Sequence, residues 1–224
     1  MKGKLICILG VDGSGKSTLA NGLVSRYGTD TQRFRYVWGG CNHYLSWPFV
    51  VLGKRIFLHK IDQYEDYEKY QHQISKTARN QVISKLYRSL IYLDYLIQIN
   101  IRLRIPLLFG EGVVTDRYVY GTIVDLAVHL GYSEEKFKEI IRMILPYCPK
   151  PDHIFLVDIP ENVALNRKDD IPSLDYLKYR RHCYLVLARD FDITILDGLK
   201  EPDELEKTAV TIINGPSTEG KQNG

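Results

Sequence analysis

The feature that most constrains this chain is a short glycine-rich segment near its start, where residues 10–17 read GVDGSGKS. The apolar run at residues 4–9 precedes it, and a helix-forming pattern begins at Thr18. A short apolar run of this kind predicts a buried parallel strand. Strand, glycine loop and helix therefore follow one another in the order of the phosphate-binding loop G-x-x-x-x-G-K-[ST].

The residue types in this loop suit the chemistry of holding a phosphate. Glycines let the backbone adopt positive φ and approach a phosphate closely, so that the loop N–H groups form an anion nest at a helix N-terminus. Lys16 would reach the β- and γ-phosphates, and the Ser17 hydroxyl would bind Mg²⁺. The alternative is a glycine-rich turn that only joins a strand to a helix. We expect the nucleotide to be bound by Gly10, Val11, Asp12, Gly13, Ser14, Gly15, Lys16, Ser17 and Thr18.

The composition is that of one ordinary globular domain. The 224 residues are 45% hydrophobic and 25% charged, which suits a single domain with a substantial core. A net charge of +3 is too small to argue for a nucleic-acid partner. No signal peptide and no apolar run long enough for a membrane span is visible, so a cytoplasmic protein is expected. The four cysteines lack zinc-site spacing and are expected to be buried, reduced thiols.

Apolar runs alternate with helical patterns along the chain, which indicates an α/β fold with a parallel sheet. Strands are predicted at residues 4–9, 33–38, 112–116, 153–159 and 193–198. The first helix is predicted to begin at residue 18, and residues 62–104 predict two helices with a break near 76–80. Further helices are predicted at 118–130, at 134–145, from Pro160 as a first helical residue, at 173–189 and at 201–212. Residues 41–60 are rich in aromatics and give no clear pattern. Residues 214–224 predict a disordered tail after a single domain of residues 1–213.

Acidic and basic side chains stand at the carboxyl end of the third predicted strand, where open parallel sheets bind their ligands. Asp116 can hold the magnesium shell from there, and Arg117 can grip an acceptor phosphate. An internal ion pair is the alternative for these two residues. Asp12, inside the loop, can orient an acceptor hydroxyl or the phosphate under attack, or it can be a solvated turn residue.

Two further pairs of cations lie late in the chain. Arg167 and Lys168 end the helix after the fourth strand, just before a short polar loop, and can close over the transferred phosphoryl group as an arginine finger in cis. The alternative is that they complement the helix dipole. Arg180 and Arg181, on the next helix, either bring one cation to the same place or form a basic surface.

Several segments, taken in order, resemble the thymidylate kinases within the P-loop nucleoside monophosphate kinases. They are residues 10–17, residues 116–118 (DRY), residues 154–167 (IFLVDIPENVALNR) and residues 176–198. The likeness covers roughly residues 3–28 and 105–212. It implies a three-layer α/β/α fold with a five-stranded parallel sheet, a magnesium–ATP donor, a mobile lid at about residues 167–173 and, in many members, a homodimer.

The resemblance also implies roles for individual residues. Lys16 and Ser17 would bind the donor phosphates and magnesium, and Asp12 would sit where the family's loop carboxylate meets the acceptor. Asp116 and Arg117 match the pair near the acceptor phosphate. Arg167 matches the start of the lid.

The acceptor side departs from the family pattern. The Arg-Glu-Pro-Gly-Gly loop after the second strand is replaced by residues 37–42, VWGGCN. On the helix before the third strand, Tyr92 falls at the family's aromatic position, Leu96 at its arginine and Asp94 between them. After Asp-Arg-Tyr the family often has Ser-Ser-x-Ala-Tyr-Gln, whereas residues 121–126 read GTIVDL. Acceptor choice is therefore expected to depend on the region of about residues 38–104.

These observations lead to one leading hypothesis and two competitors. The leading one is transfer of the γ-phosphoryl group of ATP to thymidine monophosphate, a small-molecule acceptor, to give the diphosphate. The competitors are a kinase of the same fold with another nucleotide, nucleoside or metabolite as acceptor, and a nucleotide-dependent switch without transfer activity. The expected catalytic residues are Lys16, Asp12, Arg117 and Arg167. Magnesium would be held by Ser17 and Asp116, and the acceptor by Asp12, Trp38, Tyr92, Asp116 and Arg117.

Overall fold

A computed structural model describes residues 3–28, 33–42, 81–168 and 171–215, with side chains for all of these except 81–88. A five-stranded sheet lies at the centre, with strand order β2-β3-β1-β4-β5 and every neighbouring pair parallel. The strands are β1 (Leu5–Leu9), β2 (Phe34–Trp38), β3 (Gly112–Asp116), β4 (His153–Asp158) and β5 (Thr194–Asp197). The predicted α/β class and the five-stranded parallel sheet are confirmed.

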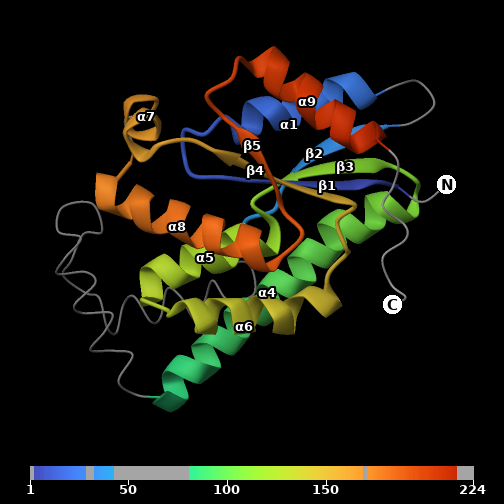
Figure 1. Cartoon of the computed structure of the whole chain (residues 1–224). Coiled ribbons are helices and arrows are strands. Elements are labelled where there is room, and N and C mark those ends of the chain that lie inside the picture. Colours follow the sequence, from blue (N-terminus) through green and yellow to red (C-terminus); the bar gives the residue numbers. More distant parts are fainter. Residues whose placement is uncertain (1–2, 29–32, 43–80, 169–170, 216–224) are drawn as a thin grey trace, which may run out of the picture.

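Helices cover both faces of the sheet, which makes three layers (Figure 1). One face carries α1 (Lys16–Tyr27) and α9 (Pro202–Asn214). The other carries α4 (Gln81–Leu108), α5 (Tyr118–Leu130), α6 (Glu134–Ile144) and α8 (Leu174–Asp190). The short helix α7 (Glu161–Asn166) follows β4, and a 3₁₀ turn (Leu145–Tyr147) follows α6.

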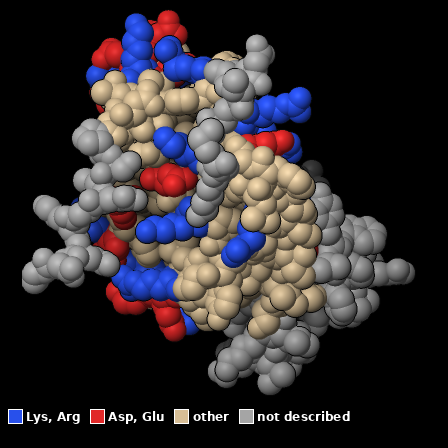
Figure 2. Space-filling model, turned by 90° about the vertical axis from the view of Figure 1, so that its right-hand side faces the viewer, with Lys and Arg blue, Asp and Glu red and all other residues tan. Residues whose placement is uncertain are grey.

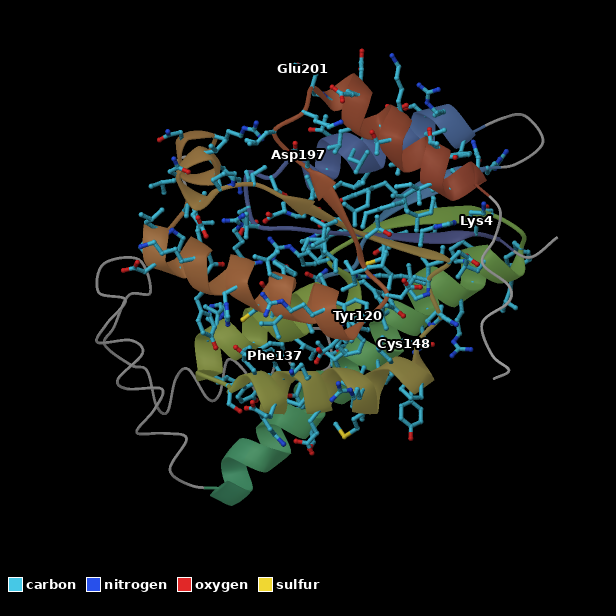
Figure 3. All side chains as sticks on the ribbon, viewed as in Figure 1. Lys4, Tyr120, Phe137, Cys148, Asp197 and Glu201 are labelled. Atoms are coloured by element: carbon cyan, nitrogen blue, oxygen red, sulfur yellow. The ribbon has the colours of Figure 1, made fainter. Side chains whose placement is uncertain are left out.

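The side-chain alternation of buried strands divides the core in two. Along β1, Leu5, Cys7 and Leu9 pack on the α5 side of the sheet, whereas Ile6 and Ile8 pack against α1 and α9. Every residue of β1 is buried, which is why its sequence is apolar throughout rather than alternating. On the α5 side, Figure 3 shows Tyr120 and Phe137 among the side chains that fill the space between helices.

All strands end at the same edge of the sheet because they are parallel. Ile8, near the end of β1, is in register with Asp116, and Asp116 is in register with Trp38 of β2. Lys4, before β1, and Asp197, at the end of β5, lie at opposite ends of the sheet (Figure 3). The loops at the carboxyl edge therefore carry the phosphate loop, Asp116 and Arg117 together.

The long helix α4 differs from its predicted extent, because it continues past residue 104 to Leu108 and includes Pro106. A proline lacks the N–H that would bond to the carbonyl four residues before it, and its ring crowds that carbonyl, but a Schellman motif satisfies the carbonyls of the last turn. Gly110 has φ of 79°, and the Glu111 N–H donates to the Pro106 carbonyl at 3.0 Å. The Schellman motif at Gly110 thus terminates the helix, and Pro106 does not.

The other predicted strands and helices within the described residues agree to within two or three positions, with two local corrections. Pro160 is the N-cap of α7 rather than its first helical residue. Asn214 belongs to α9, not to the tail, and accepts a hydrogen bond from the Tyr27 hydroxyl at 3.0 Å. The predicted break at 76–80, the aromatic segment 43–60 and the tail beyond 215 lie outside the described residues.

The four cysteines are free thiols. Cys7, Cys148 and Cys183 are buried as predicted, whereas Cys41 is only partly buried. Burial raises the pKa of Cys41 and of Cys148 to about 11, so both are protonated at neutral pH. Within the described part of the chain, no helix is long and apolar enough to cross a membrane.

A test of the backbone geometry that ends α5 is available at Gly131. This residue has φ of 62°, and a Cβ placed there would meet no atom within 4 Å, so a substitution would be limited by backbone conformation alone. We predict that Gly131→Ala lowers the free energy of unfolding by about 1 kcal/mol, because a left-handed L-residue is strained. Gly131→Asn should cost less, since asparagine tolerates this region. Denaturant unfolding measures both, and equal stability of Gly131→Ala and the wild type would contradict the assigned conformation.

Candidate active site

The phosphate loop needs its glycines for both conformation and space. Gly10, Gly13 and Gly15 have φ of 149°, 81° and 91°. A Cβ at Gly10 would lie 2.6 Å from the Val157 carbonyl, and one at Gly13 would lie 2.7 Å from the Ala164 carbonyl. The loop is thus pressed against β4 and α7. A Cβ at Gly15 would instead project into open space, which leaves room for a ligand beside the loop backbone.

Lys16 lies folded over the loop with its side chain buried. Its Nζ donates to the Val11 carbonyl at 2.9 Å and lies 3.9 Å from Asp12 Oδ1. Burial lowers the pKa of the Lys16 ammonium, although the nearby carboxylates of Asp116 and Asp12 oppose this effect. The ammonium is therefore held inside the loop by groups that are weaker partners than a phosphate.

Ser17 and Asp116 place two oxygen ligands side by side. The Ser17 hydroxyl donates to Asp116 Oδ2 at 3.2 Å, and the Tyr36 hydroxyl donates to the same oxygen at 3.5 Å. The second oxygen, Asp116 Oδ1, is buried and has no hydrogen-bond partner among the described residues. A hydroxyl and an incompletely satisfied carboxylate are ligands that Mg²⁺ prefers when phosphates and water complete its shell. The predicted pair therefore fits magnesium, and Tyr36 is a neighbour that the sequence interpretation missed.

Arg117 begins α5 in a strained backbone conformation, with φ of 76° and ψ of −59°. In the described part of the chain, only Arg117 and Tyr118 have positive φ without being glycine. The surrounding structure holds the Arg117 peptide groups, since its N–H donates to the Ile8 carbonyl at 3.0 Å and its carbonyl accepts from Gly121 N–H at 2.8 Å. Backbone strain of this kind persists where surrounding contacts hold the residue in place, which is typical of functional sites.

Four alternating charges form a closed arrangement, which we call the charge ring: Asp12, Arg117, Asp125 and Arg180. Arg117 Nη2 lies 2.8 Å from Asp12 Oδ1, and Arg117 Nη1 lies 2.7 Å from Asp125 Oδ2. Arg180 Nη1 lies 2.6 Å from Asp125 Oδ1 and 3.7 Å from Asp12 Oδ2. Each carboxylate therefore spans both arginines with separate oxygens. The charge ring joins the phosphate loop, the start of α5 and helix α8.

The charge ring keeps Asp12, Arg117 and Arg180 ionised despite their burial. Burial by itself raises the pKa of the Asp12 carboxyl, but Arg180, Arg117 and Lys16 outweigh it, and the pKa lies below the ordinary value of 3.8. Burial lowers the pKa of Arg180, yet the neighbouring acidic groups, Asp125 and Asp12 among them, raise it overall. Arg180 is only 2% exposed, so its charge is compensated within the protein rather than by water.

Asp125 was not predicted, and the signal that could have revealed it is Gly121. Arg117, Gly121 and Asp125 are spaced by four on α5, so they share one face of the helix. A Cβ at Gly121 would lie 2.7 Å from the Arg117 Cβ and 3.4 Å from the Tyr184 hydroxyl. The missing side chain lets Arg117 run along the helix to reach Asp125.

The cations at and after the predicted lid occupy different places. Arg167 Nη1 donates to the Gly198 carbonyl after β5 at 3.4 Å. Arg181 pairs with Asp158 through Nε at 2.7 Å and with Glu161 through Nη1 at 3.2 Å. Of the two alternatives for Arg180 and Arg181, the basic surface is therefore wrong. Arg180 reaches the phosphate loop, and Arg181 connects α8 to β4 and α7. Residues 169–170 of the predicted lid lie outside the described residues.

The predicted acceptor residues Trp38 and Tyr92 lie on different elements. Trp38 is 39% exposed at the end of β2, and its ring packs over Gly40, where a Cβ would lie 2.2 Å from it. The Tyr92 hydroxyl on α4 lies 3.3 Å from that of Tyr132, after α5. Residues 43–80, which complete the predicted acceptor region, lie outside the described residues.

A polar pair on α4 fastens the segment after β2. Asp94 is buried and accepts a hydrogen bond from Gln98 Nε2 at 2.7 Å. Gln98 also accepts from the Asn42 N–H at 3.3 Å and donates to its carbonyl. Leu96, at the position of the family's arginine, packs against the core. A buried amide–carboxylate pair and an apolar residue thus occupy the α4 positions that the family resemblance compares with base recognition.

The phosphate loop faces an acid–arginine turn at the carboxyl edge of a parallel sheet with strand order 2-3-1-4-5. This arrangement defines a kinase of the P-loop class.

No family profile matches the chain. A probable thymidylate kinase of Saccharolobus solfataricus is 30% identical over 215 residues, which cover 94% of this chain and 96% of that protein. A probable thymidylate kinase of Metallosphaera sedula is 27% identical over 94% of this chain and 92% of its own length. A thymidylate kinase of Carboxydothermus hydrogenoformans is 25% identical over 92% and 94%, respectively. The chain belongs to the thymidylate kinase family.

The contact between Gly121 and Arg117 can be tested by adding one methyl group. Alanine favours a helix over glycine by about 1 kcal/mol, so Gly121→Ala would stabilise α5 if nothing else changed. We predict instead that the new Cβ pushes the Arg117 side chain away from Asp125 and lowers kinase turnover by about tenfold or more. Steady-state kinetics and thermal unfolding measure the two effects. Wild-type turnover with increased stability would show that Arg117 does not need this space.

Proposed function

We propose that this chain transfers the γ-phosphoryl group of ATP to thymidine monophosphate. The observation that carries the proposal is the 2.8 Å ion pair between Asp12 of the phosphate loop and Arg117 at the end of β3. It brings a cation suited to an acceptor phosphate next to the loop suited to the donor. The full-length similarity to proteins named thymidylate kinase supports the choice of acceptor.

The donor phosphates would lie in the phosphate loop. The N–H groups of the loop and the α1 N-terminus would hold them, and Lys16 would leave the Val11 carbonyl for the β- and γ-phosphates. Ser17 and Asp116 would hold Mg²⁺, which neutralises phosphate charge when it is bound. This arrangement restrains the γ-phosphorus at the carboxyl edge of the sheet.

The acceptor phosphate would meet Arg117 on the other side. An oxygen of that phosphate forms the new bond to the γ-phosphorus while the bond from this phosphorus to the β–γ bridging oxygen breaks, and ADP leaves. The acceptor phosphate is already ionised, so the step needs positioning and charge neutralisation rather than a strong base. Lys16 and Arg117 would supply this neutralisation, Asp12 would orient Arg117, and Arg167 would add a cation when the lid closes.

A second acceptor class is favoured by one observation on α4. Leu96 is partly buried and packs against the core where the family usually presents an arginine, and Asp94 is buried beside it. A site without that arginine has lost a hydrogen bond that rejects other bases. A different nucleoside monophosphate is therefore the alternative acceptor, with Trp38 and Tyr92 as candidate contacts to its base.

An acceptor panel decides between these two proposals. With ATP and Mg²⁺, thymidine monophosphate should give the highest kcat/KM among deoxyribo- and ribonucleoside monophosphates. Lys16→Met should lower kcat with the best acceptor by about a hundredfold or more, because it removes a cation from the transition state. Lys207→Met, on the exposed side of α9, is the matched control and should retain wild-type turnover. ATP hydrolysis that no acceptor stimulates would sink the transferase assignment.

We also propose that the protein forms a homodimer through α4. An apolar stripe of i, i+4 spacing is exposed along this helix: Leu93 (54%), Ile97 (40%), Ile101 (55%) and Ile105 (49%), followed by Leu108 (83%) and Phe109 (82%). An extended exposed apolar surface of this kind marks an interaction site. Figure 2 views the molecule from the side where α4 ends in Figure 1, and a broad area there is mostly free of charged side chains.

A single charge in the stripe tests the dimer. Ile101→Glu should convert the protein to a monomer, because a carboxylate cannot be buried in an apolar interface without a partner. Met143→Glu, at a similarly exposed position on α6 (56%), should leave the dimer intact. Sedimentation velocity measures the mass of both variants. A monomeric wild type at micromolar concentration would refute the proposal.

A further inference from the structure

We propose that Asp125 and Arg180 are positioning residues for phosphoryl transfer, which hold Arg117 and Asp12 in place at the phosphate loop by closing the charge ring. The inference rests on the proposed function only in that Asp12 and Arg117 act at the reacting phosphates. Asp125 and Arg180 act through these two residues, and neither is assigned a contact with a substrate.

The geometry of Asp125 is that of a bridge. Its Oδ2 lies 2.7 Å from Arg117 Nη1 and its Oδ1 lies 2.6 Å from Arg180 Nη1. Arg117 uses its other terminal nitrogen, Nη2, for Asp12. Both terminal nitrogens of the Arg117 guanidinium are therefore held, which removes the rotational freedom that a single ion pair would leave.

Arg180 carries features that folding stability does not explain. It is 2% exposed, and its Nε and Nη2 are buried without a hydrogen-bond partner among the described residues. Tyr176 accepts a hydrogen bond from Nη1, and its ring centroid lies 5.2 Å from the Arg180 Cζ. Buried donors without partners are costly, and a buried ion pair is often no more stabilising than apolar residues of similar volume. An arginine kept at this place under these conditions points to a role in the site.

The charge ring also connects the site to the segment after the lid. Arg180 and its neighbour Arg181 both extend from α8, whose N-cap is Ser173. Arg181 binds Asp158 at the end of β4, while Arg180 reaches Asp12 and Asp125. Helix α8 therefore holds the phosphate loop from one side and the β4–α7 turn from the other.

Asp125 lies where the family pattern Ser-Ser-x-Ala-Tyr-Gln has its tyrosine, since residues 121–126 read GTIVDL. A carboxylate at this position is opposed by the buried cation Arg180 across the interface between α5 and α8. Removing one of these two charges leaves the other with a single ion partner in the charge ring, which is Arg117 for Asp125 and Asp12 for Arg180. The Asp125–Arg180 pair therefore follows from the residues of this chain and not from the family pattern.

The charged groups around Asp12 set the direction of a pH test. Lys16 faces it from α1, Arg117 from the start of α5, Arg180 from α8 and Lys168 from the end of the α7 segment. These cations favour the ionised carboxylate, so loss of one of them raises the pKa of Asp12 from its position below 3.8. The pKa of the Asp12 carboxyl is therefore the quantity to titrate in each variant.

The experiment compares Asp125→Asn, Arg180→Met and the double variant Asp125→Asn/Arg180→Met in the full chain. Lys178→Met, an exposed position on the same helix, is the matched control. Thermal unfolding, kcat and KM for the best monophosphate, the pH profile and the pKa of the Asp12 carboxyl by carbon NMR are measured for each. Each single variant should lose stability and turnover, because it removes one of the two ion partners of the remaining charge and leaves the charge ring unbalanced.

The double variant separates positioning from structure. We expect its melting temperature to return toward the wild type while kcat stays at least about tenfold low and the pKa of Asp12 remains raised. Wild-type kcat with an unshifted Asp12 pKa in the double variant would overturn the proposal, because the pair would then be only structural.

Arg180→Lys provides a second route if the double variant does not fold. It keeps the charge but not the planar guanidinium, so the pKa of Asp12 should stay low while kcat falls, and full turnover would contradict positioning by geometry. If the wild type phosphorylates no monophosphate, the proposed function fails, whereas the Asp12 titration still tests the charge ring.

Discussion

The ion pair between Arg117 and Asp12 is the interaction on which the rest of the site depends, because it joins two loops that the sheet only brings near each other. Parallel pairing of β1 and β3 sets Ile8 opposite Asp116, and the Ile8 carbonyl then accepts the Arg117 N–H. The backbone of Arg117 is forced to positive φ at this point. Its side chain is thereby directed across the sheet edge to Asp12 instead of outward into solvent.

Internal compensation of charge explains why so many cations can be buried in the site. Lys16 binds a carbonyl and a carboxylate, and each arginine of the charge ring is shared by two carboxylates. A bound polyphosphate would replace the Val11 carbonyl and Asp12 as partners of Lys16, while Asp125, held by Arg180, would continue to hold Arg117. The cations of the site are thus already in place for a negatively charged ligand, although carboxylates balance their charge. This limits the reorganisation needed during phosphoryl transfer.

Much of the fold was predictable because buried parallel strands and glycine loops have strong local signatures. The phosphate loop, the five strands and the position of Asp116 and Arg117 at a strand end all follow from residue patterns. The role of Gly110 rather than Pro106 in ending α4 depends on hydrogen bonds that a pattern does not encode. Asp125 and Arg180 were not predicted as partners, because they meet only when α5 packs on α8, and charged residues on helices usually face water.

The most direct test of the account is a crystal structure of the wild-type protein with thymidine monophosphate, Mg²⁺ and a non-hydrolysable ATP analogue. The account predicts the acceptor phosphate within hydrogen-bonding distance of Arg117 and the donor phosphates on Lys16 and the loop N–H groups. Asp125 should still hold Arg180. An acceptor phosphate bound away from Arg117 would contradict this assignment.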